Sequence, residues 1–306
     1  MNDFIIDQNS TGIRIDSFLR DRLEGVSRSH LQKMLERGEI LVNGKEVRSN
    51  YKLKPSDEIR ITEDTAPKPV DIIPQDIPLD IIYEDDDLLI VNKPKGMVVH
   101  PAAGHLDGTL VNAIMFHCGG RLSGINGELR PGIVHRIDKD TTGSLVVCKN
   151  DSAHIAVAEQ IAKHSIRRSY EGIVIGRLPQ DSGTVDAPIG RDPKNRKRMA
   201  IEKIHGKQAI THYKVLKEFK DHTYARFDLE TGRTHQIRVH MASLGHPLLG
   251  DEVYGPKKCP FNLIGQTLHA RVIGLIHPTT GEYMEWEAPL PDYFTGLLRS
   301  LSVSKE

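Results

Sequence analysis

One polar segment, RPGIVHRIDKDTTGSLVVCKN at residues 130–150, concentrates side chains that could do chemistry. Asp138 lies in it between two apolar runs, with His135 and Arg136 as basic neighbours. A carboxylate held on a loop beside cationic groups stays ionised and can act as a nucleophile or a base. The other interpretation is an ordinary turn, in which Asp138 caps the backbone of the residues that follow it. The segment alone leaves both interpretations open.

A second segment, TGRTHQIRVHMASLGHPLLGD, carries Arg238 within a helical pattern. Ile237, Met241 and Leu244 recur at helical spacing, which places Arg238 toward another side of the predicted helix. There its guanidinium could meet a carboxylate or a phosphate in a fixed geometry. A solvent-facing arginine or a surface ion pair is the commoner role for this residue type.

A third candidate is Tyr170, which follows two arginines and opens the strand-like run YEGIVIG. A tyrosine in this position could stack on a nucleic-acid base. The alternative is an ordinary strand tyrosine with its ring in the core.

The sequence contains none of the usual metal or nucleotide motifs. There is no HExxH pattern, Walker-type loop, Rossmann fingerprint or GxSxG elbow, and the histidines have no recognised ligand spacing. Cys118, Cys148 and Cys259 are too scattered for a disulfide framework or a zinc site. We therefore expect chemistry that side chains perform alone, with no metal and no cofactor.

Residues 1–62 are predicted to form a small α/β unit. Apolar residues at helical spacing indicate a helix near residues 15–23, and Ser27 is a good N-cap for a second helix. Asn43 and Gly44 lie between short apolar runs, which predicts a tight hairpin. Four prolines fall in residues 63–79, which we interpret as an extended linker.

Residues 80–306 are dominated by short strand-like runs, among them DLLIVNKP, SLVVCKN, YEGIVIG and YARFDLE. Helical stretches intervene near residues 152–163 and 234–244. Neighbouring strands with a few helices predict an α+β domain with a mixed, largely antiparallel sheet. No apolar run is long enough to span a bilayer, and the start lacks the features of a signal peptide. We therefore expect a cytoplasmic protein without a membrane partner; no coiled-coil or symmetric-interface signal argues against a monomer.

The formal net charge is zero, but basic residues gather in two places. Electrostatic binding of nucleic acid depends on such patches rather than on the average. The residues that we expect to contact RNA are Arg14, Ser27, Arg28, Lys33, Arg37, Asn43 and Gly44 in the first unit, and Arg191, Arg196, Lys197 and Arg198 in the second.

Five segments together resemble one family. HRIDKDTTGSLVV closely resembles the signature of the RluA family of pseudouridine synthases, with Ile137 and Thr142 as mild departures. LLIVNKPKGMVVHP, RRSYEGIVIG, GRTHQIRVHMASLGHPLLGDEVYG and LHA with a later HP resemble its other motifs, in the same order. Residues 13–61 resemble an S4 RNA-binding module. This combination looks most like the RluD branch of the family, which modifies large-subunit ribosomal RNA.

The resemblance implies an activity and roles for the matched residues. The enzyme would isomerise uridine to pseudouridine in large-subunit ribosomal RNA or its assembly precursor. Asp138 would be the catalytic aspartate, Arg238 its ion-pair partner, and Tyr170 the residue packed against the target base. Arg136, with His135 beside it, would help to displace that base from its stack. Because the reaction involves no net redox change, the resemblance also implies no cofactor.

Two other functions compete with this one. A non-catalytic RNA-binding or ribosome-associated protein would have no need to retain Asp138, Tyr170 and Arg238 together. A hydrolase of glycosidic bonds usually pairs two carboxylates, and only Asp140 lies near Asp138 in the sequence.

Overall fold

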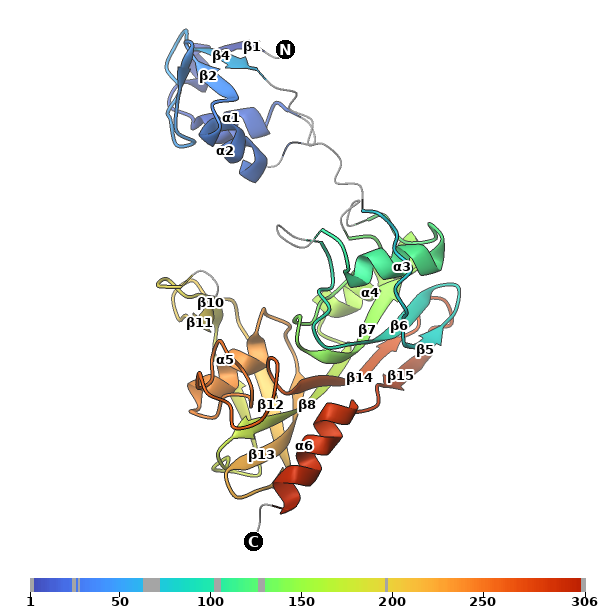
Figure 1. Cartoon of the computed structure of the whole chain (residues 1–306). Helices are drawn as coiled ribbons and strands as arrows, with labels where there is room; N and C mark the ends of the chain where they lie inside the picture. The colour runs from blue at the N-terminus through green and yellow to red at the C-terminus, as the bar shows by residue number, and fades with distance from the viewer. Residues whose placement is uncertain are drawn as a thin grey trace. The chain divides into compact units, whose positions relative to one another are not determined.

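The chain folds as two units, residues 1–71 and 72–306, and Figure 1 labels their elements. The computed structural model describes residues 3–23, 26, 28–62, 72–101, 106–125, 130–195 and 198–303. Ser27, Arg196, Lys197 and residues 63–71 of the expected linker lie outside the described residues. No helix in the described ranges is both long and apolar enough to cross a membrane.

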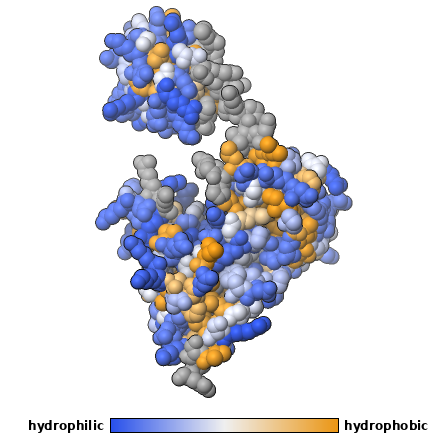
Figure 2. Space-filling view, in the orientation of Figure 1, coloured by the Kyte–Doolittle hydropathy of each residue, from blue (hydrophilic) through white to orange (hydrophobic). Residues whose placement is uncertain are grey.

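The N-terminal unit packs two helices on a small sheet. Its elements are β1 (Asp3–Ile5), the 3-10 helix η1 (Gln8–Ser10), α1 (Ile15–Arg20), α2 (Arg28–Glu36), β2 (Ile40–Val42), β3 (Lys45–Glu46) and β4 (Glu58–Ile61). The strand order is β1-β4-β2-β3, and each pairing is antiparallel. Leu31, Ile40 and Ile59 are buried in its core, and the face seen in Figure 2 is mostly hydrophilic.

The predicted elements of this unit are confirmed. Both helices form, and the apolar side chains that define their inner faces are buried. The predicted hairpin joins β2 to β3 through Asn43 and Gly44, whose φ angles are 51° and 74°. Two consecutive positive φ angles are what a two-residue hairpin turn needs, and asparagine and glycine adopt them at low cost.

The strands of the C-terminal unit form one large sheet and a small arm. They are β5 (Ile81–Glu84), β6 (Leu88–Lys93), β7 (Thr142–Cys148), β8 (Arg167–Ile175), β9 (Ser182–Asp186), β10 (Ile189–Arg191), β11 (Met199–Ile201), β12 (Ile210–Glu218), β13 (His222–Leu229), β14 (Leu268–Ile276) and β15 (Tyr283–Glu287). The nine strands of the large sheet follow the order β5-β6-β7-β14-β8-β13-β12-β9, with β15 also on β14. The hairpin β10–β11 stands apart from it.

Among the described strand pairs, β7 and β14 alone run parallel, and they meet where β7 begins. Gly143 has a φ of 108°, and a Cβ there would lie 2.2 Å from the carbonyl oxygen of Ala270. Only glycine permits this approach of two backbones. The loop that carries Asp138 therefore lies at the middle of the sheet, where β7 meets β14.

The helices of this unit cover different parts of the sheet. They are α3 (Leu110–Cys118), α4 (Asp151–Ala162), α5 (Gln236–Ser243) and α6 (Asp292–Val303). Figure 1 shows α3 and α4 beside β6 and β7, and α5 beside β12. A capping box formed by Thr109 and Asn112 starts α3, and Asn150 caps α4. The expected α+β architecture with a largely antiparallel sheet is confirmed.

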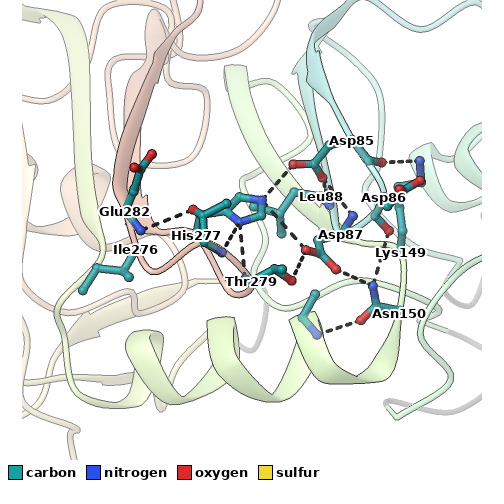
Figure 3. A network of polar contacts seen from close by, with 12 residues as sticks. Asp85, Asp86, Asp87, Leu88, Lys149, Asn150, Ile276, His277, Thr279 and Glu282 are labelled. Atoms are coloured by element: carbon teal, nitrogen blue, oxygen red, sulfur yellow. Dashed lines mark hydrogen bonds and ion pairs between the residues drawn. The ribbon is translucent and has the colours of Figure 1, made fainter.

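A polar network ties three turns together at one end of the sheet (Figure 3). The buried His277 accepts hydrogen bonds at Nδ1 from the backbone N–H groups of Thr279 and Thr280. Its ring proton is therefore assigned to Nε2, which donates to Asp85 Oδ2 at 2.8 Å. Asp87 accepts from Thr279 and from Asn150 at the start of α4. The network joins the β5–β6 turn, the β14–β15 turn and the β7–α4 junction.

Replacing His277 by alanine is expected to lower the free energy of unfolding by about 1–3 kcal/mol, because buried partners lose their hydrogen bonds. Trp286 is the single tryptophan and is buried in this unit, so its fluorescence in denaturant reports unfolding of this unit alone. The control is His212→Ala, which removes hydrogen bonds to Thr184 and Glu230 at a more exposed site. Equal losses in the two variants would show that burial of the network contributes nothing.

Candidate active site

Asp138 lies in the loop that leads into β7, with its side chain 18% exposed. Its Oδ2 accepts a hydrogen bond from Arg238 Nη1 at 2.9 Å. The backbone N–H of Thr141 donates to the carbonyl of Asp138 and closes a turn. The turn interpretation is thus correct for the backbone, whereas the carboxylate faces Arg238 rather than capping the turn. The carboxylate is therefore available there to a bound molecule.

Arg238, on α5, is held between two carboxylates and is 7% exposed. Its Nε and Nη2 donate to the two oxygens of Asp251 at 2.7 and 2.9 Å, which leaves Nη1 for Asp138. Burial lowers the pKa of the guanidinium, but the bonds to Asp251 and the charge of Asp138 outweigh it and raise the pKa. The expected ion pair is therefore present as a buried contact, and the surface interpretation of Arg238 is wrong.

Asp251 holds the guanidinium of Arg238 in a fixed orientation. Besides the guanidinium, it accepts hydrogen bonds from the backbone N–H groups of Val253 and Tyr254. Burial raises the pKa of Asp251, but Arg238 and these bonds bring the pKa below its ordinary value. A bidentate pair with fixed backbone support orients the guanidinium, so Asp251 sets the direction in which Arg238 presents Nη1.

Tyr170 lies within β8, which begins three residues earlier than predicted, at Arg167. Its backbone pairs with Phe227 on β13 and Ala270 on β14. Burial raises the pKa of the phenol, so Tyr170 stays protonated at neutral pH. Its ring belongs to the apolar core and also lines a small cavity with Asp138. A core position and stacking on a base are thus compatible for Tyr170, because one face of its ring can pack in the core while the other faces the cavity.

The small cavity opens beside a larger one of about 550 Å³. Arg136, Tyr170, Leu229 and Arg233 line both. The larger volume is within the usual range of ligand pockets. Asp138 therefore lies at the edge of a space large enough to admit part of a substrate.

His235 is also close to Asp138, and Tyr254 fixes its ring. Its Nε2 is 3.9 Å from Asp138 Oδ1, and its Nδ1 is 2.8 Å from the hydroxyl of Tyr254. That hydroxyl accepts a hydrogen bond from the backbone N–H of Met199 on β11. Burial, opposed by Asp138, lowers the pKa of His235, so the ring is neutral at pH 7. Tyr254 thus connects the β10–β11 hairpin to the surroundings of Asp138.

Lys93 holds the loop of Asp138 from behind. Its buried ammonium donates to the carbonyls of Pro94, Met97 and Lys139, each at 2.9 Å. Burial lowers the pKa of Lys93 to about 7, although the nearby Asp140 and Asp138 oppose the shift. Because Lys139 follows Asp138 directly, the hydrogen bond from Lys93 to the carbonyl of Lys139 fixes the position of the Asp138 carboxylate.

Comparison with known proteins shows the family to which this chain belongs. Residues 87–243 match the model of the RNA pseudouridylate synthase family, and residues 13–59 match the S4 domain. The uncharacterized RNA pseudouridine synthase YlyB of Bacillus subtilis is 52% identical, over 94% of each chain. The chain belongs to the RNA pseudouridine synthase family. The ribosomal large subunit pseudouridine synthase D of Zymomonas mobilis is 46% identical, over 96% of this chain and 95% of that one.

Solved structures agree with this family's fold. Human RNA pseudouridylate synthase domain containing 1 matches with a TM-score of 0.56 and 24% identity, over 77% of this chain and 97% of that one. The synthase family acts on RNA by isomerisation, so the protein is an RNA-modifying isomerase with an S4 domain at its N-terminus. The non-catalytic interpretation is set aside.

The two residues expected to displace the target base lie differently in this synthase. Arg136 is exposed and lines both cavities beside Asp138. His135 accepts a hydrogen bond at Nε2 from the backbone N–H of Val146. Burial and then Arg168 lower its pKa to about 3, so the ring is neutral. Only its other edge is free to face a substrate.

The residues expected to bind RNA fall into exposed and engaged groups. Lys33, Arg37 and Arg191 are exposed, and Arg37 also pairs with Glu39 at 3.6 Å. Arg14 and Arg28 both pair with the buried Asp16, which Gln32 also contacts. The two arginine side chains are still 42% and 43% exposed. A buried carboxylate needs such partners, so these two arginines also serve the fold.

The remaining candidates are partly occupied by contacts within the synthase. Asn43 bonds through its amide to Asp57 and accepts from the backbone N–H of Glu58, while Gly44 is exposed at the turn. The guanidinium of Arg198 lies 5.1 Å from the centre of the Tyr254 ring. A cation over an aromatic face is held there by the ring's charge distribution, which joins the end of the hairpin loop to Tyr254.

Sequence reasoning missed Lys93, Asp251, His235 and Arg168. All four lie inside segments that resemble family motifs, and that signal could have drawn attention to them. Nothing in the residue types says that Asp251 pairs with Arg238, because thirteen residues and a turn separate them. Arg168 stands next to another arginine, and only burial distinguishes the two.

Proposed function

We propose that this synthase isomerises specific uridines of large-subunit ribosomal RNA in the cytoplasm, with Asp138 as its essential nucleophile or base. The observation that carries the substrate assignment is the similarity, over nearly the whole of both chains, to a protein named for that substrate. The S4 domain at the N-terminus supports an RNA that is larger than the target loop. Free RNA and an assembling subunit are both compatible with this proposal.

The proposed mechanism begins with displacement of the target nucleotide from its stack. Reaching the C1′–N1 bond inside folded RNA requires this step, which costs a few kcal/mol. The exposed guanidinium of Arg136 is well placed to occupy the vacated space, because it lines the cavity beside Asp138. The uracil ring would then lie against Tyr170.

Isomerisation breaks the C1′–N1 bond, rotates the base and joins it again through C5; the C5–H bond breaks, and N1 gains a proton in return. The carboxylate of Asp138 would attack the sugar or remove its C2′ proton, and Arg238 would hold it in position through Nη1. The protonated hydroxyl of Tyr170 would lie near the carbon that loses its proton. Asp138, Arg238 and Tyr170 together supply the groups that this sequence of steps uses.

The proposed substrate is tested by incubating the full chain with unmodified transcripts of large-subunit RNA, small-subunit RNA and transfer RNA. Carbodiimide-dependent primer extension then maps pseudouridine in each. We expect stops at a few sites of the large-subunit transcript alone. Stops confined to either of the other transcripts would contradict the substrate. Large-subunit particles isolated from cells that lack the enzyme would show whether assembly intermediates react faster than free RNA.

The S4 domain is expected to contribute affinity through Lys33 and Arg37, which are exposed and lie four residues apart along α2 and its end. Replacing both by alanine should weaken RNA binding about tenfold and reduce the dependence of log Kd on log salt by about 2. The control is Lys54→Ala with Arg60→Ala, two exposed cations of the same unit that are not on this helix. Equal weakening by both pairs would mean that the helix is not the RNA-binding face.

A further inference from the structure

A buried cation close to the active site has no carboxylate partner among the described residues. Arg168, on β8, is 7% exposed, and its Nη2 donates to the backbone carbonyl of Glu230 at 3.0 Å. Its Nε is buried without a hydrogen-bond partner, and no described carboxylate forms an ion pair with it. A buried guanidinium with unused donors is costly unless an anion meets it. The proposed mechanism gives Arg168 no part.

The larger of the two cavities beside Tyr170 surrounds this guanidinium with further cations. Four arginines and three histidines are among its lining residues, and none of the described lining residues is acidic: the basic ones are His100, Arg130, His135, Arg136, His164, Arg168 and Arg233. Burial together with nearby arginines lowers the pKa of His100 to about 4. The four arginines make the cavity positively charged. Such a lining favours an anion over a neutral or cationic ligand.

Arg168 lines this cavity next to Gly232, in the segment before α5. A Cβ at Gly232 would lie 2.4 Å from Arg168 Nη1, so the guanidinium packs closely against this glycine. Arg168 and Tyr170 are two residues apart on β8 and therefore point to the same face of the sheet. Arg233 also lines both cavities, and its Nε donates to the carbonyl of Gln208. An anion at Arg168 would thus be a neighbour of a base lying against Tyr170.

We propose that Arg168 and Arg233 bind one phosphodiester group of the RNA strand, adjacent to the target uridine. Each nucleotide of the substrate brings one such anion, and a guanidinium can meet two of its oxygens at once. This phosphate site would fix the distance between the strand and Asp138 after the nucleotide has left its stack. The inference rests on the proposed function, because it assumes that the target base lies at Asp138 and Tyr170.

The first test compares Arg168→Met with Arg167→Met on a stem-loop RNA that carries a mapped target uridine. Arg167 is adjacent in β8, is 46% exposed and pairs with Glu285, so it is a matched control outside the cavity. We expect Arg168→Met to lower kcat/KM by about 10- to 100-fold, the usual value of a hydrogen bond to a charged group. The loss should be mainly in KM, because the contact exists before and during the reaction. Arg168→Lys should recover part of it.

The second test removes the charge from single linkages of the RNA. Methylphosphonates are placed one at a time at the linkages flanking the target uridine. A methylphosphonate at one of these linkages should lower kcat/KM of the wild-type enzyme about as much as Arg168→Met does. With that RNA, the Arg168→Met variant should show no further loss of kcat/KM. If Arg168→Met does not fold, the scan with the wild type and Arg168→Lys still decides: insensitivity to every flanking linkage overturns the proposal.

Three other outcomes are distinguished, the first of them by adding inorganic sulfate to the same assay. Competitive inhibition by inorganic sulfate without sensitivity to any linkage would assign the cavity to a free anion and overturn the phosphodiester. Absence of product from the wild type on the RNA with native linkages would contradict the proposed substrate. Product there, with equal kinetics of Arg168→Met and Arg167→Met, would contradict the phosphate site alone.

Discussion

Replacing Asp138 by asparagine is expected to lower the rate of pseudouridine formation by about 10²- to 10⁴-fold, the range that positioned acid–base groups supply. The amide keeps the shape of the side chain, and its oxygen can still accept from Arg238 Nη1. It has no negative charge with which to attack carbon or remove a proton. The loss should therefore appear in kcat, with RNA affinity nearly unchanged.

The measurement is a time course of carbodiimide-dependent stops on unmodified large-subunit RNA. Asp140→Asn is the matched control, because it removes the same charge from the same loop at a residue that does not line the cavity of Asp138. The control should retain most of the activity. If Asp138→Asn kept more than about a tenth of the wild-type rate, a loss smaller than such groups normally cause, Asp138 would not be the essential group.

Much of the fold follows from local patterns in the sequence. The Asn43–Gly44 turn forms because both residues tolerate positive φ, and the fully buried β7 forms from a continuous apolar run after Gly143. The order of motifs indicated the family, and the ion pair of Arg238 with Asp138 came from the same resemblance. In each case the information lies within a few residues or within one motif.

Other features depend on contacts that local patterns do not encode. Arg167 and Arg168 are identical in type, yet one faces a surface glutamate and the other a cavity, because successive strand residues point to opposite faces. Arg28 pairs with Asp16, which lies twelve residues away in the sequence. The orientation of Arg238 depends on Asp251, which a turn after α5 places beside it. Such pairings are set by tertiary packing.

Replacing Arg238 by methionine is expected to lower the free energy of unfolding of the catalytic unit by about 3–5 kcal/mol at pH 7.5, in addition to abolishing turnover. Asp251 would then be buried with an uncompensated charge, because its remaining partners are two backbone N–H groups. Trp286 fluorescence in denaturant measures this loss in the catalytic unit. Arg226→Met, which breaks a more exposed pair with Asp228, should cost less than about 1 kcal/mol.

The dependence of that loss on pH identifies its cause. In the wild type, Arg238 helps to keep the pKa of Asp251 below its ordinary value, so Asp251 stays ionised and contributes stability that is lost only as pH falls below that value. Without Arg238, burial should raise the pKa of Asp251 above its unfolded value, and the variant should regain stability as pH falls from 7.5 to 5. Adding Asp251→Asn should restore part of the stability and remove this pH dependence. A deficit that stayed constant between pH 5 and 7.5 would mean that lost packing, rather than an unpaired carboxylate, destabilises the variant.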